Sequence, residues 1–244
     1  MTLATLPGLP EVRAGDDLAA LLATAAGRLE GGLRPRDVLA VAHKVVSKAE
    51  GRVVRLANID PGPGARALAA EHGKDPRHVQ AILDESAEVL RADAGRLICR
   101  TRHGFVCANA GVDASNAGAP ESLVLLPADP DASARALRRA LGCAVVITDS
   151  FGRAWRNGQC EVAIGCAGLA PADDWRGRAD SDGRELAATV IAIADEAAAA
   201  ADLARGKDTR EPAVRLRGLD RHVTGEDGPG AAALVRALED DLFR

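Results

Sequence analysis

Near the middle of the chain the sequence reads Cys143-Ala-Val-Val-Ile-Thr-Asp149-Ser150-Phe-Gly-Arg153-Ala-Trp-Arg156. An apolar, β-branched run ends at a carboxylate and a hydroxyl, and then turns through glycine into two arginines. This pattern predicts a buried strand whose polar residues lie at the carboxyl edge of a sheet, where α/β proteins usually bind ligands. Asp149 and Ser150 offer hard oxygens for Mg²⁺ or Mn²⁺. Arg153 and Arg156 offer planar donors for phosphate or carboxylate.

A second segment of the same character reads Val106-Cys-Ala-Asn109-Ala-Gly-Val-Asp113-Ala-Ser115-Asn116. Asp113 and Asp149 together would form a metal site from two strand ends. The alternative is that each caps a turn or a helix, since an aspartate before Ala-Ser-Asn is also typical of an N-cap. Ser150 is equally open between a metal ligand and a turn hydroxyl. The spacing alone leaves both interpretations standing.

Composition excludes several classes of protein. A chain of 244 residues can bury a substantial core. Its 31 basic and 35 acidic residues are spread widely, which argues against a nucleic-acid-binding tract. Aromatic residues are too few for a base-stacking surface, so aliphatic side chains and abundant alanine must form the core. No signal peptide and no membrane-length apolar run is visible, and we therefore expect a soluble, cytoplasmic protein.

The five cysteines and five histidines match no metal-binding signature. The cysteines form no CxxC pair and mostly lie in apolar runs, which predicts buried free thiols in a reducing compartment. No Ser-His-acid or Cys-His order is present, so covalent catalysis is not favoured.

Helix and strand patterns do not alternate strictly, which favours a two-lobed α+β fold with largely antiparallel sheets over a doubly wound sheet. Helices are predicted at Asp16–Glu30, Pro63–Gly73, Pro76–Ser86, Asp131–Leu141, Asp182–Arg205 and Ala231–Leu242. Strands are predicted at Arg36–Ala42, 51–57, Val89–Leu97, Ile98–Arg102, Gly104–Asn109, Leu123–Pro127, Val145–Thr148, Val162–Ala167 and Ala213–Arg217. The three strands between Val89 and Asn109 should be antiparallel, because brief links join them.

Three further segments have both a functional and a structural interpretation. His43-Lys44-Val-Val-Ser47-Lys48 follows a buried strand, where lysines can hold phosphate oxygens but more often form a solvated edge. Leu6-Pro7-Gly8-Leu9-Pro10 is a rigid turn that either presents backbone amides to a nucleotide or has no ligand. Gly206-Lys207-Asp208 follows the alanine-rich segment and also fits a simple helix C-cap.

Seven short motifs occur in one order along the chain. They are Gly8-Leu-Pro, Val46-Ser-Lys-Ala-Glu-Gly-Arg52, Asn109-Ala-Gly-Val-Asp-Ala-Ser-Asn116, Ile147-Thr-Asp-Ser-Phe-Gly-Arg153, Ala163-Ile-Gly-Cys-Ala-Gly168, Asp174-Trp-Arg-Gly-Arg178 and Gly183-Arg-Glu-Leu186. Together they resemble the coenzyme F-420-0:L-glutamate ligase family, the GTP-dependent γ-glutamyl ligases of deazaflavin biosynthesis. The resemblance extends from about residue 6 to about residue 220.

The resemblance implies a homodimer, expected to be intertwined, that binds GTP with two divalent cations (Mg²⁺ or Mn²⁺), with K⁺ as a further candidate. The implied reaction joins L-glutamate to F-420-0, or its dehydro form, through a γ-linkage and releases GDP and phosphate. A carboxylate is a poor acyl donor, so a ligase of this kind first transfers a phosphoryl group to it and forms an acyl phosphate.

The same resemblance assigns site residues by motif. Asp113 and Asp149 would hold one cation, and Ser150 would help hold the second. The nucleotide site would be lined by Pro7, Gly8, Leu9, Pro10, His43, Lys44, Lys48 and Asn116, with the loop of Gly206, Lys207 and Asp208 closing over the phosphates. Our hypothesis adds Arg153 or Arg156 as the residue that orients a substrate carboxylate or phosphate. Residues 204–212 align poorly, which leaves any metal ligand there unassigned.

Some bacterial members of the family carry a C-terminal nitroreductase-like domain. This chain ends at Arg244 without one, and we expect a single ligase domain over residues 1–244, either stand-alone or excised. Two rival classes would use the same residues, namely a two-metal GTP phosphohydrolase and a non-catalytic GTP-binding protein. Release of GDP that depends on glutamate and acceptor would distinguish the ligase from both.

Overall fold

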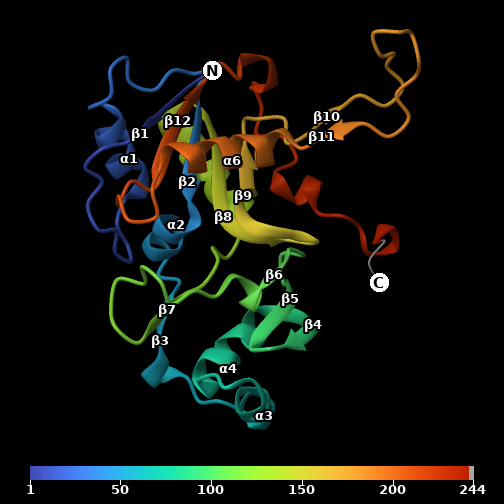
Figure 1. Ribbon diagram of the computed structural model, residues 1–244. Helices are drawn as coiled ribbons and strands as arrows, with labels where there is room; N and C mark the ends of the chain where they lie inside the picture. Colours follow the sequence, from blue (N-terminus) through green and yellow to red (C-terminus); the bar gives the residue numbers. More distant parts are fainter. Residues whose placement is uncertain (242–244) are drawn as a thin grey trace.

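The computed structural model describes residues 1–241 and shows an α+β protein with two lobes (Figure 1). The larger lobe is built on a five-stranded sheet of order β1-β12-β2-β8-β9. Its strands are β1 (Thr2–Thr5), β2 (Val38–Ala42), β8 (Ala144–Arg153), β9 (Arg156–Ala167) and β12 (Ala213–Arg217). The β2–β8 pair is parallel and its neighbours pair antiparallel. The predicted class is therefore confirmed.

The smaller lobe is an insertion between helices α2 and α5 of the larger one. It contains the antiparallel strands β4 (Ser86–Asp93), β5 (Arg96–Thr101) and β6 (Val106–Ala108), together with the pair β3 (Val53–Arg55) and β7 (Ser122–Val124). The predicted antiparallel arrangement of the β4–β6 region is thus confirmed. This lobe has its own core around Ile82, Leu97 and Cys99.

The described chain contains the following helices. They are α1 (Leu18–Ala26), α2 (His43–Ala49), α3 (Pro63–His72), α4 (Pro76–Glu85), α5 (Pro130–Leu141), α6 (Ile193–Ala204), and the 3₁₀ turns η1 (Leu56–Asn58), η2 (Asn109–Gly111), η3 (Asp220–His222), η4 (Ala231–Leu234) and η5 (Leu238–Asp240). A further short strand pair, β10 (Asp173–Asp174) with β11 (Val190–Ile191), begins the arm that projects from the larger lobe in Figure 1.

Helices cover both faces of the central sheet, because successive residues of a strand point to opposite faces. On β2, Leu39 and Val41 pack into a core shared with α1 and α5. Val38 and Ala40 pack on the other side, against α6. The buried face of α6 is made largely of alanines, and these small side chains let the helix lie close to the sheet (Figure 1).

Helix α5 begins where the sequence predicts it, because its capping residues are encoded locally. Asp129 is the N-cap and accepts a hydrogen bond from the amide of Ala132 at 2.9 Å. Pro130 is the first helical residue, and Gly142 closes the helix at φ 70°. Where the helix start meets β9, a Cβ on Gly165 would lie 2.3 Å from the carbonyl oxygen of Pro130, so only glycine fits.

Among the sequence predictions that are wrong in extent or type, three concern β8, α6 and the C-terminal segment. Strand β8 does not end at Thr148 but continues through Asp149 and Ser150 to Arg153, because it stays paired with β9. The predicted helix Asp182–Arg205 begins only at Ile193, since β-branched Val190 and Ile191 pair with β10 instead.

The third concerns the predicted C-terminal helix Ala231–Leu242, of which Leu242 lies outside the described residues. Within residues 231–241 the chain forms the turns η4 and η5 in its place. The carboxylate of Asp131 accepts hydrogen bonds from the amides of Ala231 and Ala232 and anchors the first turn, and Val235 is then extended.

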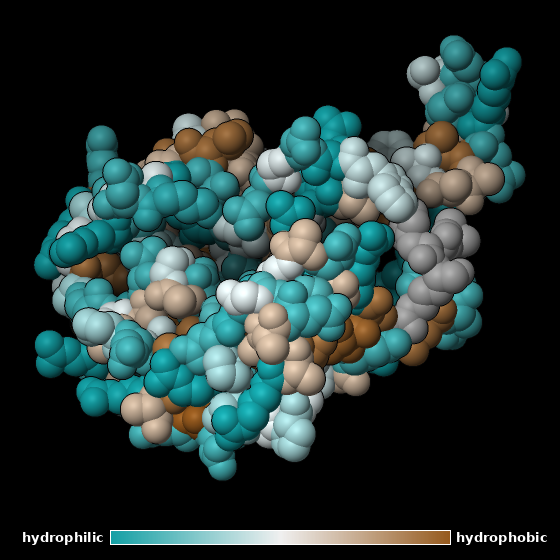
Figure 2. Space-filling view, turned by 60° about the horizontal axis from the view of Figure 1, so that its bottom comes forward, coloured by the Kyte–Doolittle hydropathy of each residue, from teal (hydrophilic) through white to brown (hydrophobic). Residues whose placement is uncertain are grey.

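The face of the molecule shown in Figure 2 is mostly hydrophilic, with apolar residues in separate patches, and the tip of the projecting arm is polar. All five cysteines are free and four are buried, as predicted. Within residues 1–241, none of the helices has the length and apolar character needed to cross a membrane.

Candidate functional site

The candidate site lies where the parallel strands β2 and β8 run side by side. Ala42 pairs with Thr148, so the next residues, His43 and Asp149, are neighbours at the same edge. The ring Nε2 of His43 lies 3.3 Å from Asp149 Oδ1, but the two are not aligned for a hydrogen bond, and this buried nitrogen has no hydrogen-bond partner. The other ring nitrogen lies 3.3 Å from Ser47 Oγ.

A β-bulge immediately precedes Asp149. Ile147 pairs with Gly165 and Thr148 pairs with Ala163, so β9 has one extra residue at this point. Bulges of this kind change the direction of side chains and are common beside active sites. Burial, aided by the charge of Asp149, raises the pKa of Cys107 on β6 of the smaller lobe to about 12.

The first of two oxygen clusters surrounds Lys44, in the first turn of α2. Its ammonium donates to Asp113 Oδ2 at 2.6 Å, to Ser115 Oγ at 2.7 Å and to the carbonyl oxygen of Ser115 at 2.9 Å. Burial alone would raise the pKa of Asp113, but the hydrogen bonds from Lys44 and Ser115 lower it below its ordinary value. We call Lys44, Asp113 and Ser115 the Asp113 cluster.

The second cluster surrounds Ser150, directly after Asp149. Its hydroxyl donates to Glu161 Oε1 at 2.5 Å and accepts from the ammonium of Lys207 at 2.6 Å. Arg205 donates to Glu161 Oε2 and to Thr148 Oγ1, both at 2.7 Å. We call Thr148, Ser150, Glu161, Arg205 and Lys207 the Glu161 cluster.

Electrostatics keep Glu161 ionised although it is almost fully buried. Burial tends to raise the pKa of this carboxyl, but the charge of Arg205 and the hydrogen bonds from Ser150 and Thr148 lower it overall. A buried carboxylate is tolerated only with such partners, so the cluster is held together as a unit.

Helix α2 contacts both Asp113 and Asp149, and its presence corrects the expectation of a solvated strand edge. His43 contacts Asp149 while Lys44 contacts Asp113, so consecutive residues reach both predicted carboxylates. Lys48 follows one turn later and is buried, with its ammonium paired to Glu11. The structure thus places the three basic residues predicted for the nucleotide site on one helix.

Other residues predicted for the nucleotide site lie at the borders of this region. The turn at Pro7–Pro10 is fixed by Arg28, which donates to the carbonyl oxygens of Pro7 and Gly8. Gly8 has φ 68°, and a Cβ there would meet the Arg28 guanidinium at 2.4 Å. Asn116 is exposed, with φ 54°, in the turn beyond Asp113.

The predicted loop of Gly206, Lys207 and Asp208 comes close to Ser150. Lys207 makes that contact, and Thr209 folds back to donate to the carbonyl oxygen of Gly206 at 3.1 Å. The loop begins directly after α6, so the helix fixes its position.

Arg153 and Arg156 lie elsewhere, at the tip of the β8–β9 hairpin. Both are exposed, and Arg153 donates to the carbonyl oxygens of Asn157 and Gly158 in its own hairpin. Arg153 lies three residue steps along the extended strand from Ser150, a length of about 10 Å. A substrate would have to extend along the hairpin to meet them.

The donor set fits hard divalent cations that keep water and phosphate ligands. Within residues 1–241 there is no group of three or more His, Cys, Asp or Glu side chains arranged to hold a metal. Mg²⁺ rarely needs such a cage, because it is usually bound by one or two carboxylates and by substrate phosphates. In both clusters a lysine ammonium already takes the place of a cation among oxygen atoms.

The sequence predictions did not include Glu161, Arg205 or Ser115. Glu161 lies opposite Ser150 in the β8–β9 register, and only this pairing brings the two together. One signal was present, since Glu161 is a lone carboxylate beside an apolar run, and such a residue is buried only with a partner.

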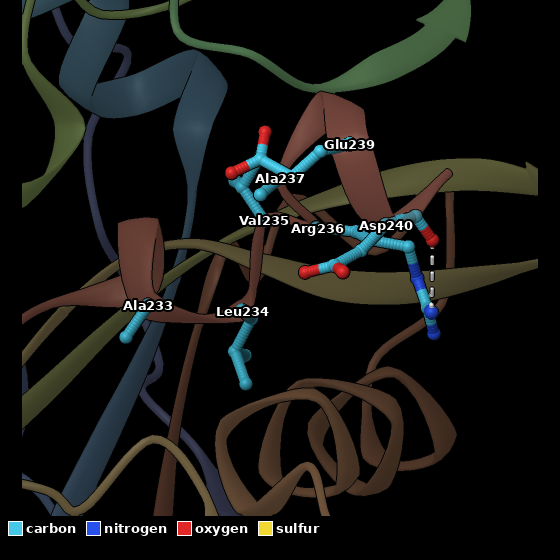
Figure 3. Close-up of a pocket in the computed structure, with 7 residues that line it drawn as sticks. All are labelled: Ala233, Leu234, Val235, Arg236, Ala237, Glu239 and Asp240. Atoms are coloured by element: carbon cyan, nitrogen blue, oxygen red, sulfur yellow. Dashed lines mark hydrogen bonds between the residues drawn. The ribbon is translucent and has the colours of Figure 1, made fainter.

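One hollow lies away from this chemistry, beside the C-terminal segment. Its volume is about 590 Å³. Figure 3 shows the residues that line it, Ala233–Ala237, Glu239 and Asp240. Its single drawn hydrogen bond joins Arg236 to the carbonyl oxygen of Asp240. None of the predicted site residues lines it, so we assign it no role.

Comparison with known proteins agrees with the motif order. The family model described as F420-0:Gamma-glutamyl ligase matches residues 8–218. A protein of Methanopyrus kandleri named "Coenzyme F420:L-glutamate ligase" is 47% identical over 96% of this chain and 94% of its own length. Proteins of the same name from Methanothermobacter thermautotrophicus and Halobacterium salinarum are 45% and 46% identical, over 100% and 97% of this chain and 99% and 93% of their own lengths. The chain therefore belongs to the F420-0:gamma-glutamyl ligase family.

Proposed function

We propose that this protein is a GTP-dependent ligase that adds L-glutamate through a γ-linkage to coenzyme F-420-0 or its dehydro form. The observation that carries the proposal is the 45–47% identity, over nearly the whole chain, to proteins named for this ligation. The geometry of the site supports it, because carboxylates and lysines meet at one sheet edge, as phosphoryl transfer requires.

The reaction proceeds in two steps. The γ-phosphoryl group of GTP passes to a carboxylate oxygen of the acceptor, which gives GDP and an acyl phosphate. The amine of glutamate then attacks the acyl carbon, phosphate leaves with the bonding electrons, and the amine loses a proton. Divalent cations neutralise the phosphate charge when they are bound, while the protein contributes mainly positioning and electrostatics.

The proposal gives the site residues the following roles. Asp113 and Asp149 would hold one cation, and Ser150 would help hold the second. Lys44 and Lys48, on one face of α2, would bind phosphate oxygens as point charges. The turn at Pro7–Pro10, His43 and Asn116 would border the nucleotide, and the Gly206–Asp208 loop would lie over its phosphates. A homodimer, a K⁺ requirement and a role for Arg153 or Arg156 in orienting a substrate are parts of the same proposal.

The decisive measurement is product formation from purified components. With GTP, Mg²⁺ or Mn²⁺, L-glutamate and F-420-0, the protein should release GDP and yield a product heavier by one glutamyl unit in mass spectrometry. Omission of either glutamate or acceptor should abolish that product. Glutamate-independent phosphate release would favour a GTP phosphohydrolase, and GTP binding without turnover would favour a binding protein. Either result would refute the ligase proposal.

A further inference from the structure

The ammonium of Lys207 occupies a position among oxygens that also suits a cation. It lies 2.6 Å from Ser150 Oγ, 3.2 Å from Glu161 Oε1 and 3.6 Å from Asp202 Oδ1. An ammonium and a divalent cation cannot use the same two oxygen atoms at once. The position is therefore one for which lysine and metal would compete.

The contacts of Glu161 leave one of its carboxylate oxygens facing this position. Oε2 is fixed by the buried guanidinium of Arg205 at 2.7 Å, while Oε1 faces Ser150 and Lys207. Because the hydroxyl of Ser150 donates its proton to Oε1, its lone pairs point outward, where they meet Lys207. The result is an ordered pair of hard oxygens, one charged and one neutral, held by a buried network.

The two cations that touch Glu161 differ in how firmly they are held. The side chain of Arg205 is 7% exposed and also donates to Thr148 and to the carbonyl oxygen of Pro212. The side chain of Lys207 is 70% exposed. An exposed ammonium regains water on release, so Lys207 can leave at little cost while Arg205 stays.

We infer that Glu161 and Ser150 together form the protein's ligand pair for the second divalent cation, and that Lys207 and this cation bind to the pair alternately. The inference rests on the proposed function for the presence of a second cation. Once displaced, Lys207 is free to reach phosphate oxygens from the loop that follows α6. Cation binding would thus release the lysine that the nucleotide needs.

A direct test is titration of the purified protein with Mn²⁺ alone, with free Mn²⁺ measured by electron paramagnetic resonance. Lys207→Met removes the competing ammonium. It should lower the Kd of the affected site for Mn²⁺ about fivefold, the effect typical of a partly exposed ion pair. Lys74→Met makes the same charge change beyond α3, in the smaller lobe, and should leave Mn²⁺ affinity unchanged. Equal affinities in the wild type and Lys207→Met would overturn the competition.

Glu161→Gln tests the ligand itself. It should reduce the number of bound Mn²⁺ ions by one, and Lys207→Met added to it should then have no effect on the remaining site. Circular dichroism must show that the variant is folded, and Ser150→Ala offers a milder removal of a ligand from the same pair. Persistence of both Mn²⁺ ions in Glu161→Gln and in Ser150→Ala would refute the assignment.

The Mn²⁺ titration tests the inference about Glu161, Ser150 and Lys207, and the ligase assay separately tests the proposed function. Wild-type protein that forms the glutamyl product, while its Mn²⁺ binding is indifferent to Glu161, Ser150 and Lys207, would refute the inference and leave the proposed function intact. Protein that binds Mn²⁺ as described but forms no product would refute the function instead.

Discussion

The Asp113 cluster and the Glu161 cluster place the same two groups, a carboxylate and a lysine, in opposite surroundings. In the Asp113 cluster the carboxylate side chain is 43% exposed and the side chain of Lys44 is 20% exposed. In the Glu161 cluster the carboxylate is 5% exposed and Lys207 is 70% exposed. Lys44 also belongs to a helix, whereas Lys207 belongs to a loop.

The contrast indicates which partner in each cluster is fixed. Lys44 is held by α2 against the β2–β8 edge, so Asp113 and its turn are the adaptable side. Glu161 is held by Arg205 within the sheet, so Lys207 is the adaptable side. The proposed site for GTP and two cations would therefore contain one fixed and one movable charge in each cluster.

The largest effect should come from breaking the buried half of the Glu161 cluster. Arg205→Met leaves the buried carboxylate of Glu161 with an exposed lysine in place of a buried arginine as its charged partner, and should lower the free energy of unfolding by about 3 kcal/mol. Denaturant unfolding would measure the change. Arg176→Met removes an exposed arginine paired with Asp174 and should have little effect. Equal stability of the two variants would contradict a structural role for Arg205.

Asp149→Asn should remove metal-dependent turnover while the fold survives. The loss of a charged ligand is worth several kcal/mol, so we expect kcat to fall about 100-fold or more. Product formation and circular dichroism measure the two parts of this prediction. Asp93→Asn, an exposed aspartate on β4, is the matched control. A fully active Asp149→Asn enzyme would rule out the metal role, and Asp113→Asn should behave like Asp149→Asn.

Acid should weaken the Glu161 cluster. The pKa of Glu161 is below its ordinary value of 4.5, so its contribution to stability is complete above that value and is lost as the pH falls through the folded-state pKa. The free energy of unfolding should therefore decline below about pH 5. Urea unfolding at a series of pH values should show a smaller decline in Glu161→Gln. An identical pH dependence in the variant would show that Glu161 is not the group responsible.

The smallest effect should come from the hairpin tip. Arg153→Ala or Arg156→Ala should raise the KM for glutamate or acceptor, or lower kcat, by about fivefold, since an exposed arginine adds a modest charge-assisted contact. Stability should not change. Unchanged kinetics in both variants would remove these arginines from the site.

Local signals predicted the fold where they were strong. The β12 strand (Ala213–Arg217) has the predicted bounds, and α5 starts at a proline after a capping aspartate. Helix α2 was missed for a physical reason, because its N-cap is Ala42 and provides no side-chain hydrogen bond to mark the start. Strand β8 was cut short at Asp149 because polarity suggested an end where pairing with β9 continues.

The site could be predicted only as far as residues close in sequence allow. Asp149, Ser150 and Asp113 follow recognisable apolar runs, and Lys207 belongs to a loop that the sequence already singles out. Glu161 and Arg205 act through cross-strand and helix–sheet contacts that no local pattern contains. Such contacts depend on which strands pair and in which register, and this cannot be derived from local patterns in a single sequence.

The alanine-rich face of α6 has a consequence for the evolution of this protein. Residues such as Ala197, Ala198 and Ala201 set how far the helix axis stands from the sheet, and Arg205 reaches Glu161 from the end of that helix. The small size of these alanines therefore fixes the distance between α6 and the sheet, and the Arg205–Glu161 contact depends on that distance. A single methylene added to one of them would push the helix away from the sheet. We therefore expect this face to tolerate fewer substitutions than its simple apolar composition suggests.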